Sequence, residues 1–142
     1  MADQSKKEYS LNFQGYWREV NKGGIPSRSG IYLVYRCLYN PEQNTVGLKE
    51  IIYIGQAEDA HNRIVNHDKL DEFNDKLQQG EELCYSFAEV DKENLNIVEN
   101  ALVFAQKPIL NDKLKDKFNY PPVAIKIDGR CARMKYTDFT IS

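Results

Sequence analysis

The chain has 142 residues, of which 42% are hydrophobic and 28% are charged, and this size and composition fit one soluble globular domain. No apolar run reaches the roughly 18 residues that a membrane span needs. The polar start, MADQSKKEYS, also lacks the apolar segment of a secretory signal. The three cysteines are far apart and odd in number, so they predict neither a metal-ligand spacing nor a disulfide framework. These features argue against a membrane-spanning or disulfide-rich secreted protein and favour a cytoplasmic one in a reducing compartment.

Charge is distributed unevenly along the chain. The net charge of −2, taken alone, argues against a dedicated nucleic-acid binder. However, ten acidic and three basic residues fall between His67 and Asn100, whereas eight basic and three acidic residues fall from Lys107 to Lys135. We therefore expect the basic residues to flank any phosphate-binding groove and the acidic segment 68–93 to face away from it. A solvated surface with uneven charge explains the same pattern equally well.

The first predicted elements form a hairpin. Residues 1–10 are charged and predict a loose end, and the glycine-containing segment 11–29 predicts an irregular lead-in. Residues 30–38 and 49–55 are rich in β-branched and aromatic side chains, so they predict two strands. The turn-rich residues 39–47 between them predict an antiparallel hairpin with a longer loop than usual.

Helices and a third strand follow the hairpin. Asp59 can cap a helix over residues 60–68, and a second helix is expected over 69–79. Residues 83–90 alternate enough to predict a strand with one half-buried face.

The last part of the chain predicts a helix and a second hairpin. The helix covers residues 92–106, and Pro108 stops it. The hairpin joins residues 123–127 to residues 130–136 through Asp128-Gly129. The mixture of helices and strands predicts an α+β fold, in which helices pack on a small, mainly antiparallel sheet.

Glu99 is the first candidate for chemistry. It shares a face of the predicted helix with Leu95, Leu102 and Val103. An ionised carboxylate half buried in such a face costs several kcal/mol unless a cation or hydrogen-bond donors meet it. A magnesium ion, with water and a substrate phosphate completing its ligands, would suit one carboxylate. Periodicity alone favours the simpler alternative, in which Glu99 faces solvent.

Four further side chains could contribute to a site. Arg63 and His67 are four residues apart on one helix face, where they could hold a phosphate and move a proton. A solvated helix side explains this pair more simply. Tyr32 and Tyr53 lie on the two paired strands, where tyrosines usually serve packing. The chain has no Gly-rich phosphate loop and no motif for a nucleophilic serine or cysteine.

The order of these residues resembles a known signature. The triplets Gly30-Ile31-Tyr32 and Tyr53-Ile54-Gly55, followed by Arg63 and His67, resemble the motifs of the GIY-YIG nuclease family. Downstream, the sequence is similar to the closing motif of that family, in which a glutamate precedes two apolar residues, a proline and an asparagine. The matching positions are Glu99, Leu102-Val103, Pro108 and Asn111.

The resemblance covers most of the chain and implies a domain organisation. Residues 30–111 would form the GIY-YIG nuclease-like domain, a small three-stranded antiparallel sheet flanked by helices. Residues 1–29 would be an N-terminal extension. Residues 112–142 would be a C-terminal extension with a β-hairpin, packed on the same domain.

The resemblance also implies roles for the aligned side chains. Tyr32 would act on the attacking water as its general base or as its orienting partner, and Tyr53 would hydrogen-bond water or the scissile phosphate. Arg63 would stabilise charge on the phosphoryl oxygens. His67 would position the site or relay a proton.

Two more residues of the family pattern complete the expected site. Glu99 would hold one Mg²⁺ or Mn²⁺ ion, and Asn111 would tie the end of the last helix to the site by hydrogen bonds. A tyrosine with a free pKa near 10 is a poor base at neutral pH unless a nearby cation lowers that pKa.

The chain departs from the family pattern at three places. Some 20 residues separate Tyr32 from Tyr53, which implies an insertion in the hairpin. Ala57 stands where a hydroxyl residue is common, and Ala60 replaces a larger apolar residue. None of these changes removes a member of the expected catalytic set.

The resemblance therefore implies a metal-dependent endonuclease that acts on DNA, in a family that includes excision-repair incision subunits, homing endonucleases and restriction enzymes. A catalytically silent module that binds nucleic acid or a protein partner is the alternative, and action on RNA is a third possibility. The sequence does not indicate an oligomeric state.

Overall fold

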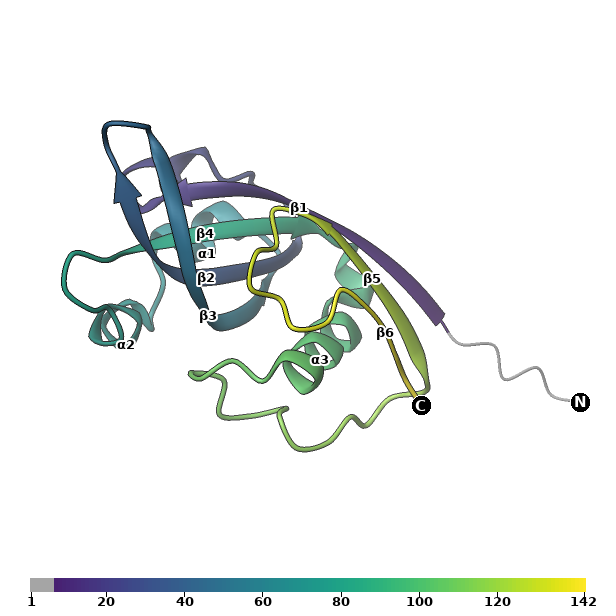
Figure 1. Ribbon diagram of the computed structural model, residues 1–142. Coiled ribbons are helices and arrows are strands. Elements are labelled where there is room, and N and C mark those ends of the chain that lie inside the picture. Colours follow the sequence, from purple (N-terminus) through teal and green to yellow (C-terminus); the bar gives the residue numbers. More distant parts are fainter. Residues whose placement is uncertain (1–6) are drawn as a thin grey trace, which may run out of the picture.

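Six strands form one curved sheet in the computed structural model, which describes residues 7–142 (Figure 1). The elements in chain order are β1 (Lys7–Arg18), η1 (Glu19–Gly24), β2 (Gly30–Asn40), β3 (Thr45–Ala57), α1 (Ala60–Val65), α2 (Leu70–Asp75), β4 (Glu82–Glu89), η2 (Lys92–Asn94), α3 (Leu95–Gln106), β5 (Val123–Gly129) and β6 (Asp138–Ile141). The strand order in the sheet is β3-β2-β4-β1-β5-β6. The sheet is mixed, because β1 and β5 are parallel and the other pairs are antiparallel.

This sheet corrects the expected fold class. The three predicted strands do form an antiparallel unit, β3-β2-β4, but β1, β5 and β6 extend it on one side. The prediction of a small three-stranded sheet flanked by helices is therefore wrong. The prediction fails because two distant segments pair with each other. Lys7 lies opposite Val123, and Phe13 lies opposite Gly129. A local pattern cannot reveal such a pairing.

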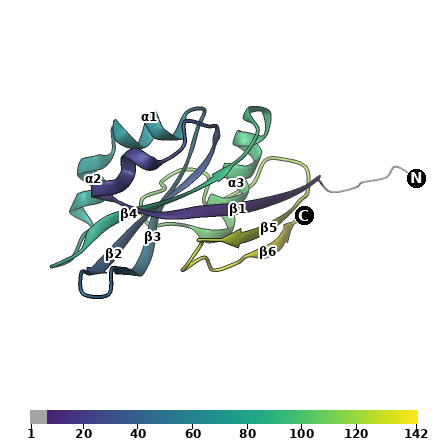
Figure 2. The ribbon, with the colours of Figure 1, turned by 90° about the horizontal axis from the view of Figure 1, so that it is seen from above.

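Strand β1 covers residues 11–18 of the irregular lead-in expected over residues 11–29. Leu11 and Phe13 alternate with exposed polar residues and are almost fully buried, as in a strand with one face on the core. Residues 7–10 also belong to this strand, so the expectation of a loose end fails for them. The rest of that expectation, residues 1–6, lies outside the described residues. Figure 2 shows β5 and β6 beside the N-terminal half of β1.

The hairpin of β2 and β3 is longer than expected, and its loop is shorter. Pairing runs from Gly30 opposite Ala57 to Asn40 opposite Thr45. Only residues 41–44 remain for the turn, in which the Asn40 side chain accepts hydrogen bonds from two backbone N–H groups. The inserted residues therefore lengthen the strands, and the prediction of a long loop is wrong.

Two hydrophobic cores lie on opposite faces of the sheet. Alternate residues of β2 serve each core, because successive side chains of a strand point to opposite faces. Ile31 and Leu33 pack with the apolar face of α3, and Tyr32 and Val34 pack with α1 and α2. The central strands are thus covered on both sides.

The helices are shorter than predicted. Asp59 caps α1 as expected, since its carboxylate accepts a hydrogen bond from the Asn62 backbone N–H at 3.1 Å. However, α1 ends at Val65 and α2 at Asp75, and a 3-10 turn replaces the first residues of the third predicted helix. That helix, α3, ends at Gln106 before Pro108, as predicted.

The C-terminal hairpin has a different second strand from the predicted one. Strand β6 is Asp138–Ile141, whereas residues 130–136, where the strand was expected, form turns. The buried Gln106 side chain holds these turns in place, because its oxygen accepts hydrogen bonds from the Lys135 and Tyr136 N–H groups.

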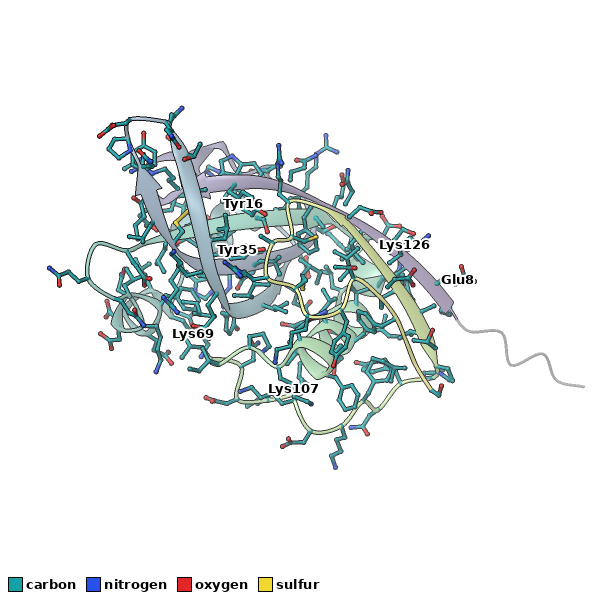
Figure 3. All side chains as sticks on the ribbon, in the orientation of Figure 1. Glu8, Tyr16, Tyr35, Lys69, Lys107 and Lys126 are labelled. Atoms are coloured by element: carbon teal, nitrogen blue, oxygen red, sulfur yellow. A yellow bond between two sulfur atoms is a disulfide. The ribbon has the colours of Figure 1, made fainter. Side chains whose placement is uncertain are left out.

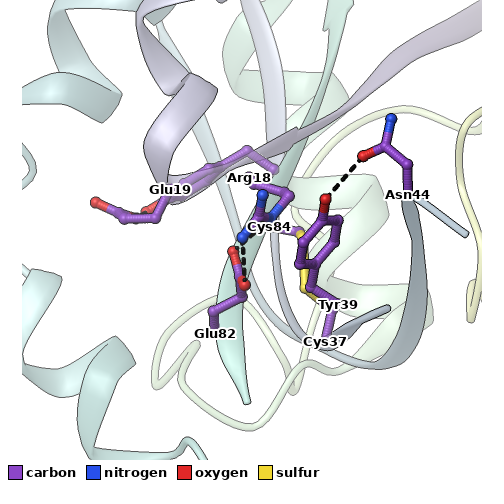
Figure 4. Close-up of polar contacts among 8 residues, drawn as sticks. Arg18, Glu19, Cys37, Tyr39, Asn44, Glu82 and Cys84 are labelled. Atoms are coloured by element: carbon purple, nitrogen blue, oxygen red, sulfur yellow. Dashed lines mark hydrogen bonds and ion pairs between the residues drawn. A yellow bond between two sulfur atoms is a disulfide. The ribbon is translucent and has the colours of Figure 1, made fainter. Parts of the chain in front are cut away.

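Two of the three cysteines are joined, which corrects the expectation of no disulfide. Cys37 of β2 and Cys84 of β4 form a disulfide, and Cys131 is free. The two strands are neighbours in the sheet, and this brings together cysteines 47 residues apart in the sequence. Figure 4 shows the disulfide beside Arg18, which pairs with Glu82 and lies over the Tyr39 ring.

Among residues 7–142, no helix is long and apolar enough to cross a membrane.

Gly55 brings the two tyrosine-bearing strands together. Gly55 lies opposite Tyr32 in the ladder, and a Cβ atom at this position would overlap the buried Tyr32 ring. The ring therefore lies directly over the backbone of β3. The Tyr32 ring of the first triplet therefore requires a glycine at position 55, in the second triplet.

We expect Gly55→Ala to lower the free energy of unfolding by about 2 kcal/mol or more, because overpacking a filled core costs about 1–3 kcal/mol. Urea unfolding followed by circular dichroism would measure the change. Gly47→Ala on the same strand is the matched control, since its Cβ would meet only the Leu38 carbonyl oxygen at 3.8 Å. Equal stability of the two variants would contradict this packing.

Candidate active site at the edge of strand β3

The outer edge of β3 is closed by the segment that follows α3. The Leu110 N–H donates to the Ile52 carbonyl at 3.0 Å. The Asn111 carboxamide accepts from the Ile54 N–H at 3.0 Å and donates to the Ile54 carbonyl at 2.9 Å. Asn111 thus pairs with the sheet edge as a neighbouring strand would. It is a buried positioning residue, in line with the tie expected for it.

An aromatic cluster surrounds His67 next to this edge. The imidazole ring centroid lies 4.7 Å from that of Phe73, 5.6 Å from Tyr32 and 5.9 Å from Tyr53. The side chain is 2% exposed. Its Nε2 atom lies 2.6 Å from the Tyr32 hydroxyl oxygen, and its Nδ1 accepts the Lys69 backbone N–H at 3.0 Å. Both ring nitrogens therefore have a defined partner.

These partners determine the tautomer of His67. Burial, together with the nearby Arg63 charge, lowers the pKa of His67 to about 4, so the ring is neutral at pH 7. Since Nδ1 accepts a backbone N–H, we assign the ring proton to Nε2, which donates it to the Tyr32 oxygen. In this arrangement His67 orients Tyr32 and cannot take its proton.

Tyr32 is held in its protonated form. It is 1% exposed, and burial raises the pKa of its hydroxyl well above the usual value of 10, although the Arg63 charge opposes the shift. Burial and the negative charge of Glu99 also raise the pKa of Tyr53. Both tyrosines are therefore hydrogen-bond donors at neutral pH, and Tyr32 could act as a base only with an added positive charge nearby.

Arg63 of α1 is the positive charge of the cluster. Its positive charge opposes, without reversing, the effect of burial that raises the pKa of Tyr32, Tyr53 and Glu99. Its guanidinium forms an ion pair with Asp68 at 2.9 Å. This pair corrects the expectation that the acidic segment faces away from the site, because Asp68 lies directly beside it.

Glu99 reaches the same place from α3. One of its carboxylate oxygens accepts a hydrogen bond from the Gln56 amide at 2.8 Å. Within residues 7–142, its second oxygen has no hydrogen-bond donor. Burial raises the pKa of Glu99, while the Gln56 hydrogen bond and Arg63 lower it. The carboxylate is therefore partly desolvated and incompletely compensated.

A pocket of about 300 Å³ opens in front of Glu99. Tyr53 and Asn111 line it, together with residues 112–114 and Lys69, which Figure 3 labels. The part of the chain that the structure describes has no group of three or more His, Cys, Asp or Glu side chains placed to hold a metal ion. One carboxylate facing a water-accessible pocket still fits a hard divalent ion that keeps most of its water ligands.

The structure thus brings the predicted residues together. Tyr53, Glu99 and Asn111 line one pocket, and Tyr32 and His67 form the buried layer behind Tyr53. Two residues that contribute to the site were not predicted from the sequence. Gln56 directly follows the second triplet and holds Glu99, and Lys69 offers both its backbone to His67 and its side chain to the pocket. The position of Gln56 next to that triplet was the available signal.

The triplets on paired strands and the pocket beside them make this chain similar to a GIY-YIG-like domain, although its sheet is larger than expected. Two curated proteins are similar to it. Both are named UvrABC system protein C. The protein from Fervidobacterium nodosum is 30% identical over 106 residues, and that from Rickettsia bellii is 29% identical over 107 residues. Each alignment covers 73% of this chain but only 17% and 15% of the respective relatives. No family model and no solved structure matches the chain.

We expect the protonation of His67 to make stability depend on pH. Its pKa is about 4 in the folded state, against about 6.5 in an unfolded chain. The unfolded state therefore takes up a proton first, and stability should fall by up to about 3 kcal/mol as pH drops from about 6.5 towards 4. Above pH 6.5 this group should have no effect.

Urea unfolding of wild type and His67→Gln across this pH range would measure the effect. The variant should lose this part of the pH dependence, and His61→Gln should keep it. The same acid slope in wild type and His67→Gln would contradict a neutral buried imidazole.

Proposed function

We propose that this chain is a metal-dependent endonuclease domain that hydrolyses phosphodiester bonds in DNA at one active site on the edge of β3. The observation that carries the proposal is the grouping of Tyr53 and Glu99 in one pocket, with Arg63 and the Tyr32–His67 pair next to it. The similarity to UvrABC system protein C supports a nuclease acting on DNA, because the GIY-YIG family includes excision-repair incision subunits. The chain spans about a sixth of the length of those relatives, so their wider activity is not carried over.

Within this proposal, residues 30–111 form the nuclease-like unit. Residues 1–29 and 112–142 are its extensions. The support is the sheet itself, since β1 from the first extension and β5 from the second pair with each other beside β4.

Hydrolysis of a phosphodiester needs a positioned water, positive charge on the non-bridging oxygens and stabilisation of the leaving oxygen. Tyr32 is suited to the first task as an orienting donor. His67 donates to its oxygen, which leaves the Tyr32 proton free for the water or the phosphate. Tyr53, 6.2 Å away between ring centroids, offers a second hydroxyl donor to the same group.

Arg63 is suited to stabilise the phosphoryl oxygens as negative charge grows on them. Its partner Asp68 is 71% exposed, and an ion pair at such a solvent-exposed position contributes little to stability. A phosphate can therefore replace Asp68 at small cost. A bidentate contact with the guanidinium would also fix the orientation of the phosphate.

Glu99 would hold the Mg²⁺ or Mn²⁺ ion, and Asn111 and Gln56 would keep the pocket and the carboxylate in place. When bound, such an ion polarises the phosphate and stabilises the leaving oxygen. The partial desolvation of Glu99 supports this assignment, since a half-buried carboxylate with one oxygen lacking a donor favours a cation.

We expect wild-type protein to nick supercoiled plasmid with Mg²⁺ or Mn²⁺ and to stop when EDTA is added. Glu99→Gln should lower the rate by at least about 100-fold, a loss within the range for removing one charge-stabilising group. DNA binding should be unchanged or tighter, because a negative charge near the phosphate is gone. Glu93→Gln, at an exposed position before α3, is the control and should cut normally.

Full nicking by purified Glu99→Gln would contradict the mechanism. No nicking by wild type with any divalent ion would instead support a silent binding module. Cleavage of RNA but not of DNA would mean that the substrate is RNA, and the assignment of the site residues would stand.

The metal site has a test that does not depend on cleavage. We expect Mg²⁺ or Mn²⁺ to raise the melting temperature of wild type in a concentration-dependent way, because a ligand that binds only the folded state stabilises it. Glu99→Gln should show no such rise. Without metal at pH 7 its melting temperature should equal or exceed that of wild type, since the raised pKa of Glu99 means that ionising it opposes folding. An equal metal-induced rise in both proteins would place the ion elsewhere.

A further inference from the structure

A second pocket lies further along the same edge of β3. It has a volume of about 440 Å³ and is lined by Lys49, Glu50 and Ile51 of β3, by residues 106–109 at the end of α3, and by Arg133 and Lys135. The proposed active site does not use any of these residues. Four of the lining side chains are basic and one is acidic.

The positive charge of this pocket is not neutralised. Its one acid, Glu50, pairs with Arg36 at 2.9 Å, outside the pocket. Within residues 7–142, Lys49, Arg133 and Lys135 form no ion pair with an acidic side chain, whereas the Lys107 ammonium donates to the Lys115 carbonyl and lies over the Phe104 ring. Unpaired cations around one hollow attract an anion, and a phosphate group matches the fork of a guanidinium best.

The basic loop is fixed over the pocket by specific contacts. The Arg133 Nε donates to the Leu48 carbonyl at 2.8 Å, which leaves the other guanidinium donors without a partner among the described residues. The Lys135 backbone N–H donates to Gln106, which is 3% exposed, at 2.8 Å. The C-terminal loop is thus bound to the end of α3 and to β3, and its cations face the hollow between them.

The two pockets are neighbours. Residues 107–109 line the basic one, and residues 110–114 line the pocket of Glu99. Along β3, Lys49 and Tyr53 are four residues apart, which is at most about 13 Å in a strand. Successive phosphates of one duplex strand lie about 6.5 Å apart, because the backbone winds around the axis while it rises about 3.4 Å per nucleotide, so this span corresponds to roughly two nucleotides.

We propose that this basic pocket holds a backbone phosphate of the DNA strand about two nucleotides from the scissile bond. The inference rests on the proposed nuclease function and extends it, because it assigns substrate binding to the C-terminal segment. Lys49, Arg133 and Lys135 position the strand and do not take part in the chemistry. The contact is to phosphate and is independent of base sequence.

Fluorescence anisotropy with a labelled duplex of about 20 base pairs, in EDTA so that nothing is cut, tests the proposal over a range of salt concentrations. The test variant combines Lys49→Ala, Arg133→Ala and Lys135→Ala. The control combines Lys7→Ala, Lys76→Ala and Lys92→Ala, which removes three exposed charges outside the basic C-terminal segment.

The pocket variant should bind DNA at least about tenfold more weakly, and the magnitude of the slope of log K against log salt should fall by about one, since one phosphate contact contributes about 0.9. The control should match wild type. If the triple variant folds poorly, the double variant with Lys49→Ala and Lys135→Ala replaces it, because it keeps the Arg133 bond to Leu48. The double variant should also bind DNA more weakly than wild type. Equal losses in pocket variant and control, or no loss in either, would overturn the proposal.

Inorganic phosphate separates a free anion from a DNA backbone. Binding of phosphate that the pocket variant loses, with unchanged DNA affinity, would mean a small-anion site and overturn the proposal. Plasmid nicking separates it from the nuclease function. If the pocket variant loses DNA binding but wild type does not nick plasmid, the result supports this inference and not the nuclease function. If wild type nicks plasmid but the pocket variant binds DNA normally, the nuclease function stands and this inference is wrong.

Discussion

The Asn111 side chain pairs with the backbone of Ile54, and the candidate site depends on this contact. A sheet edge leaves N–H and C=O groups free, and here a carboxamide satisfies both groups of one residue. The contact fixes the chain after α3 against β3, so that Tyr53 and Glu99 face the same pocket. The residues just before it, 107–109, line the basic pocket, and residues 110–114 line the Glu99 pocket.

The second constraint is the protonation of the buried layer. A neutral imidazole that accepts a backbone N–H must donate to Tyr32, and a buried phenol must keep its proton. The resting site is therefore a set of donors around a desolvated carboxylate and a guanidinium. Within the proposed function, such a set would suit phosphate oxygens and a cation. Of the two roles expected for Tyr32, the raised pKa of its buried hydroxyl favours the orienting one in the absence of added positive charge.

Local patterns in the sequence were enough to predict that β2, β3, β4 and α3 exist, because alternation, helix caps and a proline that ends a helix act within a few residues. They were not enough for β1, whose partner β5 begins more than a hundred residues later. The site residues were predicted from the order of their motifs, because each residue taken alone had a simpler structural explanation. The Asp68 ion pair, the Gln56 hydrogen bond and the Cys37–Cys84 disulfide depend on tertiary neighbours, and a sequence does not state these.

The central claim is that one divalent ion binds at Glu99 within reach of the tyrosine pair. Paramagnetic broadening by Mn²⁺ in the NMR spectrum of the intact chain tests this claim most directly. We predict that signals of Gln56 and Glu99 broaden first, followed by those of Tyr53 and Asn111, while strands β5 and β6 stay sharp. Broadening centred on the exposed acidic residues of α2, or none near Glu99 at saturating Mn²⁺, would contradict the account.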